Sequence, residues 1–229
     1  MKTFTNTAKG LALYVVLFFA LWTIRATILI PIDKSFSSPA LAQIFADTVR
    51  VLIWIVPVFV YLTWADNSNP VEYLRLNSFG NKKAVIRSSI IVFFYFAIIL
   101  LVDLARAGHP FKVTFSSLLL SNSWLKTILM ITVAPIAEEI LFRGFLLQKF
   151  QTFLGKWQAN LVTSFLFVAI HYPHWIYTEK APLEILTLSL SIFILSILLG
   201  YLMQKTETLL PSIIVHMLNN LISFYVHVG

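Results

Sequence analysis

Two adjacent carboxylates and an arginine interrupt an otherwise apolar stretch of the chain, which reads AEEILFRG from Ala137 to Gly144. In a helix, Glu139 and Arg143 are one turn apart on the same face and can pair. Glu138 points roughly 100° away from Glu139 and has no partner in its own helix. An unpaired carboxylate of this kind suits a general base. The alternative is that both carboxylates bind Arg143 in a cluster that only stabilises the fold.

Two later apolar stretches carry imidazole and carboxamide groups. His171 shares a helix face with Phe167, and His216 shares one with Asn220. Taken singly, such residues often make hydrogen bonds between membrane helices. At about 1.5 Å per residue, however, Glu138, His171 and His216 all lie roughly 12–21 Å from the cytoplasmic ends of their helices. This shared depth predicts that they meet in one hydrolytic site.

The elements that position these groups are predicted to be membrane helices. Of the 229 residues, 59% are hydrophobic and 12% are charged, whereas soluble domains have about 25% charged residues. We predict an all-α fold, a polytopic transmembrane helical bundle of about seven to eight membrane helices, with residues 1–229 forming a single integral membrane domain. Seven spans are expected, at residues 10–30, 49–65, 84–104, 124–148, 157–175, 184–204 and 209–227.

The charge distribution excludes some partners and predicts an orientation. The net charge is +7, but the basic residues are scattered through short loops without a basic stripe, so nucleic acid is not an expected partner. The expected surroundings are the lipid bilayer. The loop charges favour a cell-membrane protein with a cytoplasmic N-terminus and, for seven spans, an outside C-terminus. The run from Gly10 to Ile30 exceeds the ~7–15 residues of a signal-peptide core, which favours a retained helix. Within it, Arg25 is expected to extend toward the membrane interface.

The three groups of residues resemble the motifs of the CAAX protease and bacteriocin-processing family, which has Glu-Glu-x-x-x-Arg, Phe-x-x-x-His and His-x-x-x-Asn in successive membrane helices. All three motifs occur here in the family's order, over roughly residues 120–225, the expected protease core. Ser196 and Glu207 depart from glycines that are usual in the family. The matching residues are Glu138, Glu139 and Arg143; Phe167 and His171; and His216 and Asn220.

We therefore hypothesise a peptidase in which Glu138 takes a proton from a water held between it and His171. His216 and Asn220 would stabilise the oxyanion, and Glu139 with Arg143 would be a supporting pair; the resemblance implies the same division of roles. A competing version holds a divalent metal such as zinc on Glu138, His171 and His216, which are an adequate ligand set. The absence of cysteine excludes thiolate ligands and thiolate catalysis.

The expected substrate is a peptide or protein, and the family name extends this to lipidated ones. Two other functions remain open. A catalytically idle relative could act as a bacteriocin-immunity or scaffold protein through helix contacts. A small transporter could use the same buried charges as a solute path, although the inverted halves that transporters often have are not visible in the sequence.

Overall fold

The computed structural model describes residues 2–29, 32, 35–77, 80–107 and 124–225, and every regular element within these ranges is helical. The all-α class is therefore confirmed. The predicted span ends at Ile30 and His227 lie outside the described residues. The first half of the chain contains α1 (Lys2–Ile24), η1 (Arg25–Leu29), α3 (Pro39–Trp54), α4 (Val56–Val60), η2 (Tyr61–Ala65), α5 (Pro70–Tyr73) and α6 (Lys82–Ala107). The second half contains α7 (Trp124–Glu139), η4 (Ile140–Leu147), α8 (Gln148–Gln151), α9 (Lys156–Ala169), α10 (Tyr172–Tyr177), α11 (Pro182–Thr206) and α12 (Leu210–Tyr225).

Several of these helices have the length and composition of membrane spans. In the described chain, four are long and apolar enough to cross a bilayer, namely Ala8–Ile28, Pro39–Ala65, Lys82–Val102 and Pro182–Thr206. A shorter apolar helix covers Leu210–Ser223. Helices satisfy their backbone hydrogen bonds internally, as a bilayer requires. The protein is therefore a polytopic helical membrane protein.

The second of these helices begins earlier than predicted, at Pro39 and not at residue 49. The predicted start left Asp47 outside the span. In the structure Asp47 and Arg50 both lie inside α3, where Arg50 donates to Asp47 one turn away and Gln43 Nε2 donates to Asp47 Oδ2 at 3.0 Å. Polar side chains that satisfy one another in this way can be accommodated within an apolar helix.

Arg25 also differs from its expected position. It is buried, with 6% of its surface exposed, and lies in the π-helical segment η1. Its charge interacts with the carboxylate of Asp47 on α3. An internal carboxylate lowers the cost of a buried guanidinium, so Arg25 faces the bundle and does not extend toward an interface.

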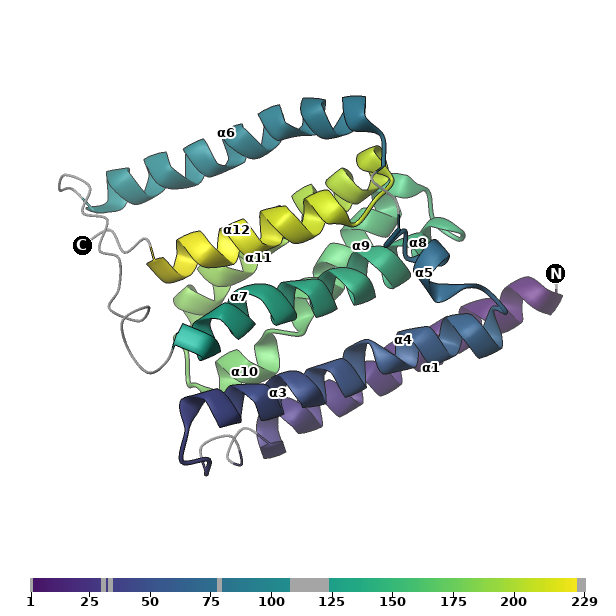
Figure 1. The fold of residues 1–229 in the computed structure, drawn as a ribbon, viewed down its shortest axis with the longest axis horizontal. Coiled ribbons are helices and arrows are strands. Elements are labelled where there is room, and N and C mark those ends of the chain that lie inside the picture. Colours follow the sequence, from purple (N-terminus) through teal and green to yellow (C-terminus); the bar gives the residue numbers. More distant parts are fainter. Residues whose placement is uncertain (1, 30–31, 33–34, 78–79, 108–123, 226–229) are drawn as a thin grey trace.

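The long helices lie side by side, with α7 near the middle of the bundle (Figure 1). Helix α7 contacts α3 on one side and α12 on another side. Helices α9 and α12 both pack on α11. Helix α6 lies at one edge, where it contacts α11, while α1 and α3 form the opposite edge. The start of α1 and the end of α12 lie at opposite ends of the bundle.

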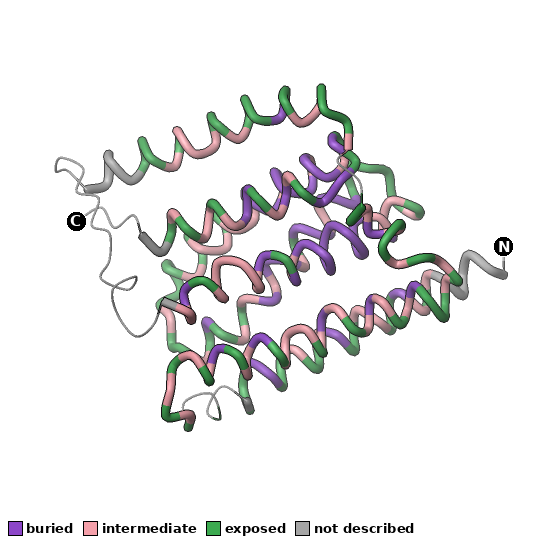
Figure 2. The backbone as a smooth tube through the Cα atoms, in the orientation of Figure 1, coloured by how far each residue is buried: buried purple, intermediate pink, exposed green. Residues whose placement is uncertain are grey.

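Burial is concentrated around the centre of the bundle (Figure 2). All eight residues of η4 are buried. Along α6, by contrast, large apolar side chains such as Ile86 and Phe93 are 70% and 68% exposed. An exposed apolar helix face of this length would be costly in water and is the surface expected to face lipid. The polar residues of interest are therefore on the helices most enclosed by protein.

Candidate active site

Four ionisable side chains from two helices form a connected cluster in the core. Arg143 Nη1 donates to Glu139 Oε1 at 2.8 Å, and His216 Nδ1 lies 2.9 Å from the same oxygen. On the other edge of its ring, His216 Nε2 lies 3.6 Å from Glu138 Oε2. The imidazole from α12 thus stands between the two carboxylates of α7. The predicted pairing of Glu139 with Arg143 is confirmed.

The two carboxylates have different surroundings. The Glu139 side chain is fully buried, whereas 12% of the Glu138 side chain is exposed. Glu139 is held by the guanidinium and the imidazole through one oxygen, and its second oxygen has no partner among the described residues. Glu138 has the longer contact to His216 and no ion pair to Arg143. Burial and pairing suit Glu139 to a structural role, while Glu138 keeps an accessible carboxylate.

Arg143 is anchored by the helices behind the cluster. Its Nη2 donates to the Ser196 hydroxyl at 2.8 Å and to the Ser196 carbonyl at 3.2 Å, and Ser196 donates to Ser164 Oγ at 3.0 Å. The guanidinium also lies 4.4 Å from the centre of the Phe167 ring, within cation–π range. Ser196 therefore supplies a hydroxyl acceptor that a glycine at this position would lack.

The hydrogen-bond partners determine which ring nitrogens face the site. His171 Nδ1 lies 2.9 Å from the Phe167 carbonyl, which can only accept, so Nδ1 carries the proton. By the same reasoning, His216 Nδ1 carries the proton that it shares with the Glu139 carboxylate. In both residues Nε2 is left for other partners. For His216 that atom is the one that faces Glu138.

His171 lies beside this cluster, in the turn between α9 and α10. Its ring centre is 5.4 Å from that of Phe167, and the His216 ring centre is 5.7 Å from the same phenyl group. His171 is close enough for the charges of Glu138 and His216 to act on it. The structure thus brings together side chains from the fourth, fifth and seventh predicted spans.

Asn220 is not drawn into the cluster. It lies one turn beyond His216 on α12, is partly exposed, and makes no hydrogen bond to another described side chain. Its neighbour Asn219 instead accepts a hydrogen bond from Tyr95 of α6 at 3.0 Å. Sequence spacing alone could not separate these neighbours, because their roles depend on which helix packs against each face.

The local backbone helps to place the carboxylates. Directly after Glu139 the helix widens into the π-helical segment η4, a feature often found at functional sites. Within it, Gly144 permits close approach by two other elements, because a Cβ there would lie 2.9 Å from Leu74 and 3.1 Å from Leu209. The loop before α6 and the start of α12 therefore pack directly on this helix.

The donor types at the site are ones that zinc accepts, but their arrangement does not form a metal site. Among the described residues, no three His, Asp or Glu side chains are grouped closely enough to hold a metal ion. We therefore derive no chemical step through a metal.

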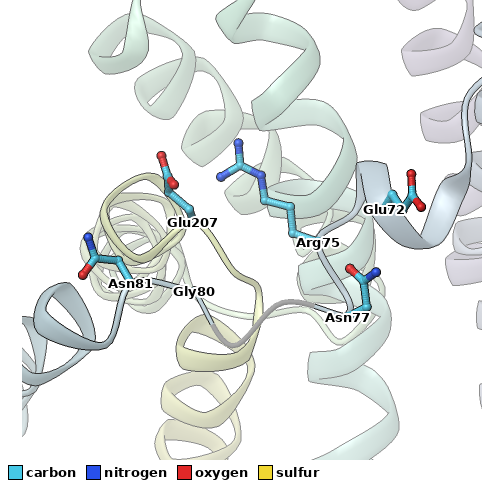
Figure 3. A pocket seen from close by; sticks show the side chains of 6 residues that line it. All are labelled: Glu72, Arg75, Asn77, Gly80, Asn81 and Glu207. Carbon is cyan, nitrogen blue, oxygen red and sulfur yellow. The ribbon is translucent and has the colours of Figure 1, made fainter.

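A separate hollow of about 480 Å³ lies where the loop before α6 meets the turn between α11 and α12 (Figure 3). None of the predicted site residues lines it. The residues that do are Glu72, Arg75, Asn77, Gly80, Asn81 and Glu207.

Comparison with known proteins finds a family match in the second half of the chain. Residues 120–222 match the family described as Type II CAAX prenyl endopeptidase Rce1-like. This part of the chain is similar to that family. The part of the chain that matches the Rce1-like family contains every predicted site residue, from Glu138 to Asn220.

A curated relative adds a more limited likeness. The chain is 34% identical over 68 residues to UPF0177 protein YbdI of Lactococcus lactis subsp. lactis (strain IL1403). The match covers 29% of this chain and 36% of that protein, so it spans about a third of the relative's length. No solved structure matches the chain. The Rce1-like match does not include the first half of the chain, which contains α1 and α3.

Proposed function

We propose that this protein is an intramembrane endopeptidase, CAAX-protease-like, that hydrolyses a peptide bond with water activated by Glu138. The observation that carries the proposal is the difference between the two adjacent carboxylates. Glu139 is fully buried and ion-paired, while Glu138 keeps 12% of its side chain exposed and faces the Nε2 atom of His216. A base must reach water and substrate, and Glu138 is the carboxylate of the pair with that access.

In the proposed reaction, a water held between Glu138 and His171 gives a proton to the Glu138 carboxylate. The resulting hydroxide attacks the carbonyl carbon of the scissile bond and forms a tetrahedral oxyanion. When protonated, His216 donates its Nε2–H to that oxyanion, and the Asn220 carboxamide adds a donor once a substrate occupies the site. Glu138 then returns the proton to the amide nitrogen as the C–N bond breaks, which yields a carboxylic acid and an amine.

Glu139 and Arg143 take no proton in this scheme. The Nδ1 contact from His216 to Glu139 sets the tautomer and the ring orientation, and Arg143 holds Glu139 through its anchor on Ser196. A positioned orienting group of this kind is a common requirement for a catalytic imidazole. The substrate is a peptide or protein, and the Rce1-like family description supports a lipidated C-terminal segment as one class.

The proposed setting is the cell membrane, crossed seven times. In addition to the helices that have the length of a span, α7 through α8 and α9 through α10 run between the same two ends of the bundle (Figure 1). Loop charges favour a cytoplasmic N-terminus and an outside C-terminus for this arrangement.

The test is cleavage by purified protein in lipid vesicles, with products identified by mass spectrometry. Peptides with and without a prenyl group serve as candidate substrates. We expect Glu138→Gln to lower the rate about 10²- to 10⁴-fold, the usual contribution of a general base. Glu184→Gln is the matched control, because Glu184 is an exposed carboxylate on α11 paired with Lys180. Equal cleavage by wild type and Glu138→Gln would show that the proposed chemistry is wrong, and a cellular phenotype kept by Glu138→Gln would favour a scaffold.

A further inference from the structure

A contact from outside the family-matched region reaches the backbone next to His171. The indole Nε1–H of Trp22, on α1, donates to the carbonyl of Ile170 at 2.7 Å. The two residues are 148 positions apart in the chain. Ile170 directly precedes the imidazole that the proposed mechanism places beside the water.

The Ile170 carbonyl lies where helix α9 breaks. The helix ends at Ala169, His171 N bonds back to the Val168 carbonyl at 3.0 Å, and α10 starts at Tyr172. Pro173 has no N–H to donate at the next turn. No backbone N–H among the described residues donates to the Ile170 carbonyl. A carbonyl without a partner inside a membrane bundle costs several kcal/mol, so the indole satisfies a group that the break leaves free.

Trp22 is itself held firmly. Its ring centre lies 4.7 Å from that of Trp54 on α3, in an edge-on arrangement. Trp54 is fully buried and lies 6.0 Å from Phe142, and Phe142 lies 5.0 Å from Phe167. An aromatic wall therefore runs from α1 to the phenyl group that both imidazoles contact. Because protein interiors are close-packed, a displacement of one of these rings would displace its neighbours.

We propose that Trp22 is a positioning residue for His171, and that the first membrane helix is thus part of the functional unit. Its hydrogen bond holds the backbone between the end of α9 and the start of α10 in place. The backbone conformation there sets the direction in which the His171 side chain points. The Nδ1 contact to the Phe167 carbonyl then fixes the ring's rotation. This inference rests on the proposed function only for its effect on the rate, since the orientation of His171 is a structural claim.

The test compares Trp22→Phe with wild type in lipid vesicles. Phenylalanine keeps an aromatic ring against Trp54 and removes the N–H donor. The matched control is Trp64→Phe, because Trp64 is 81% exposed. The first measurement is the exchange of the imidazole C2 hydrogen with deuterium, followed for each histidine by mass spectrometry. It requires no enzyme activity, so it remains informative if Glu138→Gln shows the peptidase proposal to be wrong.

We expect Trp22→Phe to change the exchange rate at His171 and to leave His216 at its wild-type rate. Cleavage should show a kcat lowered about 10-fold to 100-fold, as small misplacements of reacting groups do, with KM retained. Trp64→Phe should match wild type in both measurements. Unchanged exchange at His171 would overturn the proposal. So would equal changes at His171 and His216, because these would show a general loosening of the bundle.

Discussion

Replacing Arg143 with methionine removes the only guanidinium bound to a fully buried carboxylate within the described core. Arg143 and Glu139 have 1% and 0% of their side chains exposed, and their contact is 2.8 Å. The variant keeps an unbranched, apolar side chain of similar volume, so the change is mainly one of charge and hydrogen bonding. It tests whether the cluster is held together as the distances indicate.

The expected cost follows from what remains after the substitution. Glu139 would keep the His216 contact alone, and removing one partner of a buried ion pair destabilises a protein by about 3–5 kcal/mol. Arg143→Lys keeps the charge but loses the forked contact with Ser196. Hydrogen bonds to charged groups contribute about 1.5–3 kcal/mol, and we expect an intermediate loss of about 2 kcal/mol for lysine.

The measurement is reversible unfolding of the purified protein in mixed micelles, titrated with a denaturing detergent. The decisive comparison is the double variant Glu139→Gln/Arg143→Met, which removes both charges. If the cost of Arg143→Met comes from an unpaired buried carboxylate, the double variant should be more stable than the single one by at least about 1 kcal/mol.

Two results would refute this reasoning. A loss below about 1 kcal/mol for Arg143→Met would mean that Glu139 is not charged or not dependent on Arg143. A double variant as unstable as Arg143→Met would mean that the loss comes from packing against Phe167 and not from charge, because both variants lack the guanidinium that lies 4.4 Å from that ring.

Three further outcomes are expected. Glu207→Gly should stabilise the protein by about 1 kcal/mol in the same titration, because Glu207 ends α11 at a φ of 59°, a left-handed conformation that glycine adopts without strain; an unchanged midpoint would contradict this. Gly80→Ala should destabilise it by at least about 2 kcal/mol, since Gly80 has a φ of 66° and a Cβ there would lie 2.2 Å from the Thr206 carbonyl oxygen. Exhaustive chelation should leave wild-type peptide cleavage unchanged, and a loss that zinc restores would reinstate the metal version of the site.

Much of the arrangement follows from periodicity and from the cost of burying charge. A four-residue spacing was enough to pair Glu139 with Arg143, and the same periodicity separates Glu138 from them. Matching depth in separate helices was enough to predict that His216 would approach the carboxylates, and it does so at 2.9 and 3.6 Å. These are local rules, and they hold because ionisable groups in an apolar helix must find partners.

Contacts that depend on which helices become neighbours were not predictable in this way. Ser196 was noticed only as a departure from glycine, yet its hydroxyl accepts from Arg143 at 2.8 Å. Arg25 was expected at an interface because its distance from the end of the helix allowed it; the structure instead buries it near Asp47 of another helix. Trp22 carried no signal, since its partner is a backbone carbonyl 148 residues away. Which helices pack against one another cannot be deduced from a single sequence by these rules.

Under the proposed mechanism, the arrangement of charges explains why two adjacent carboxylates are needed. The charges of Arg143 and Glu139 cancel, and when His216 is protonated its charge offsets that of Glu138, 3.6 Å away. When Glu138 takes the proton from water, its negative charge disappears and an equal charge appears on the oxyanion. Charge therefore moves toward the Nε2–H of His216 without being created in a medium where isolated charges are costly. A single carboxylate could not both orient the imidazole through Nδ1 and accept the proton on its other side, because the two nitrogens point in opposite directions.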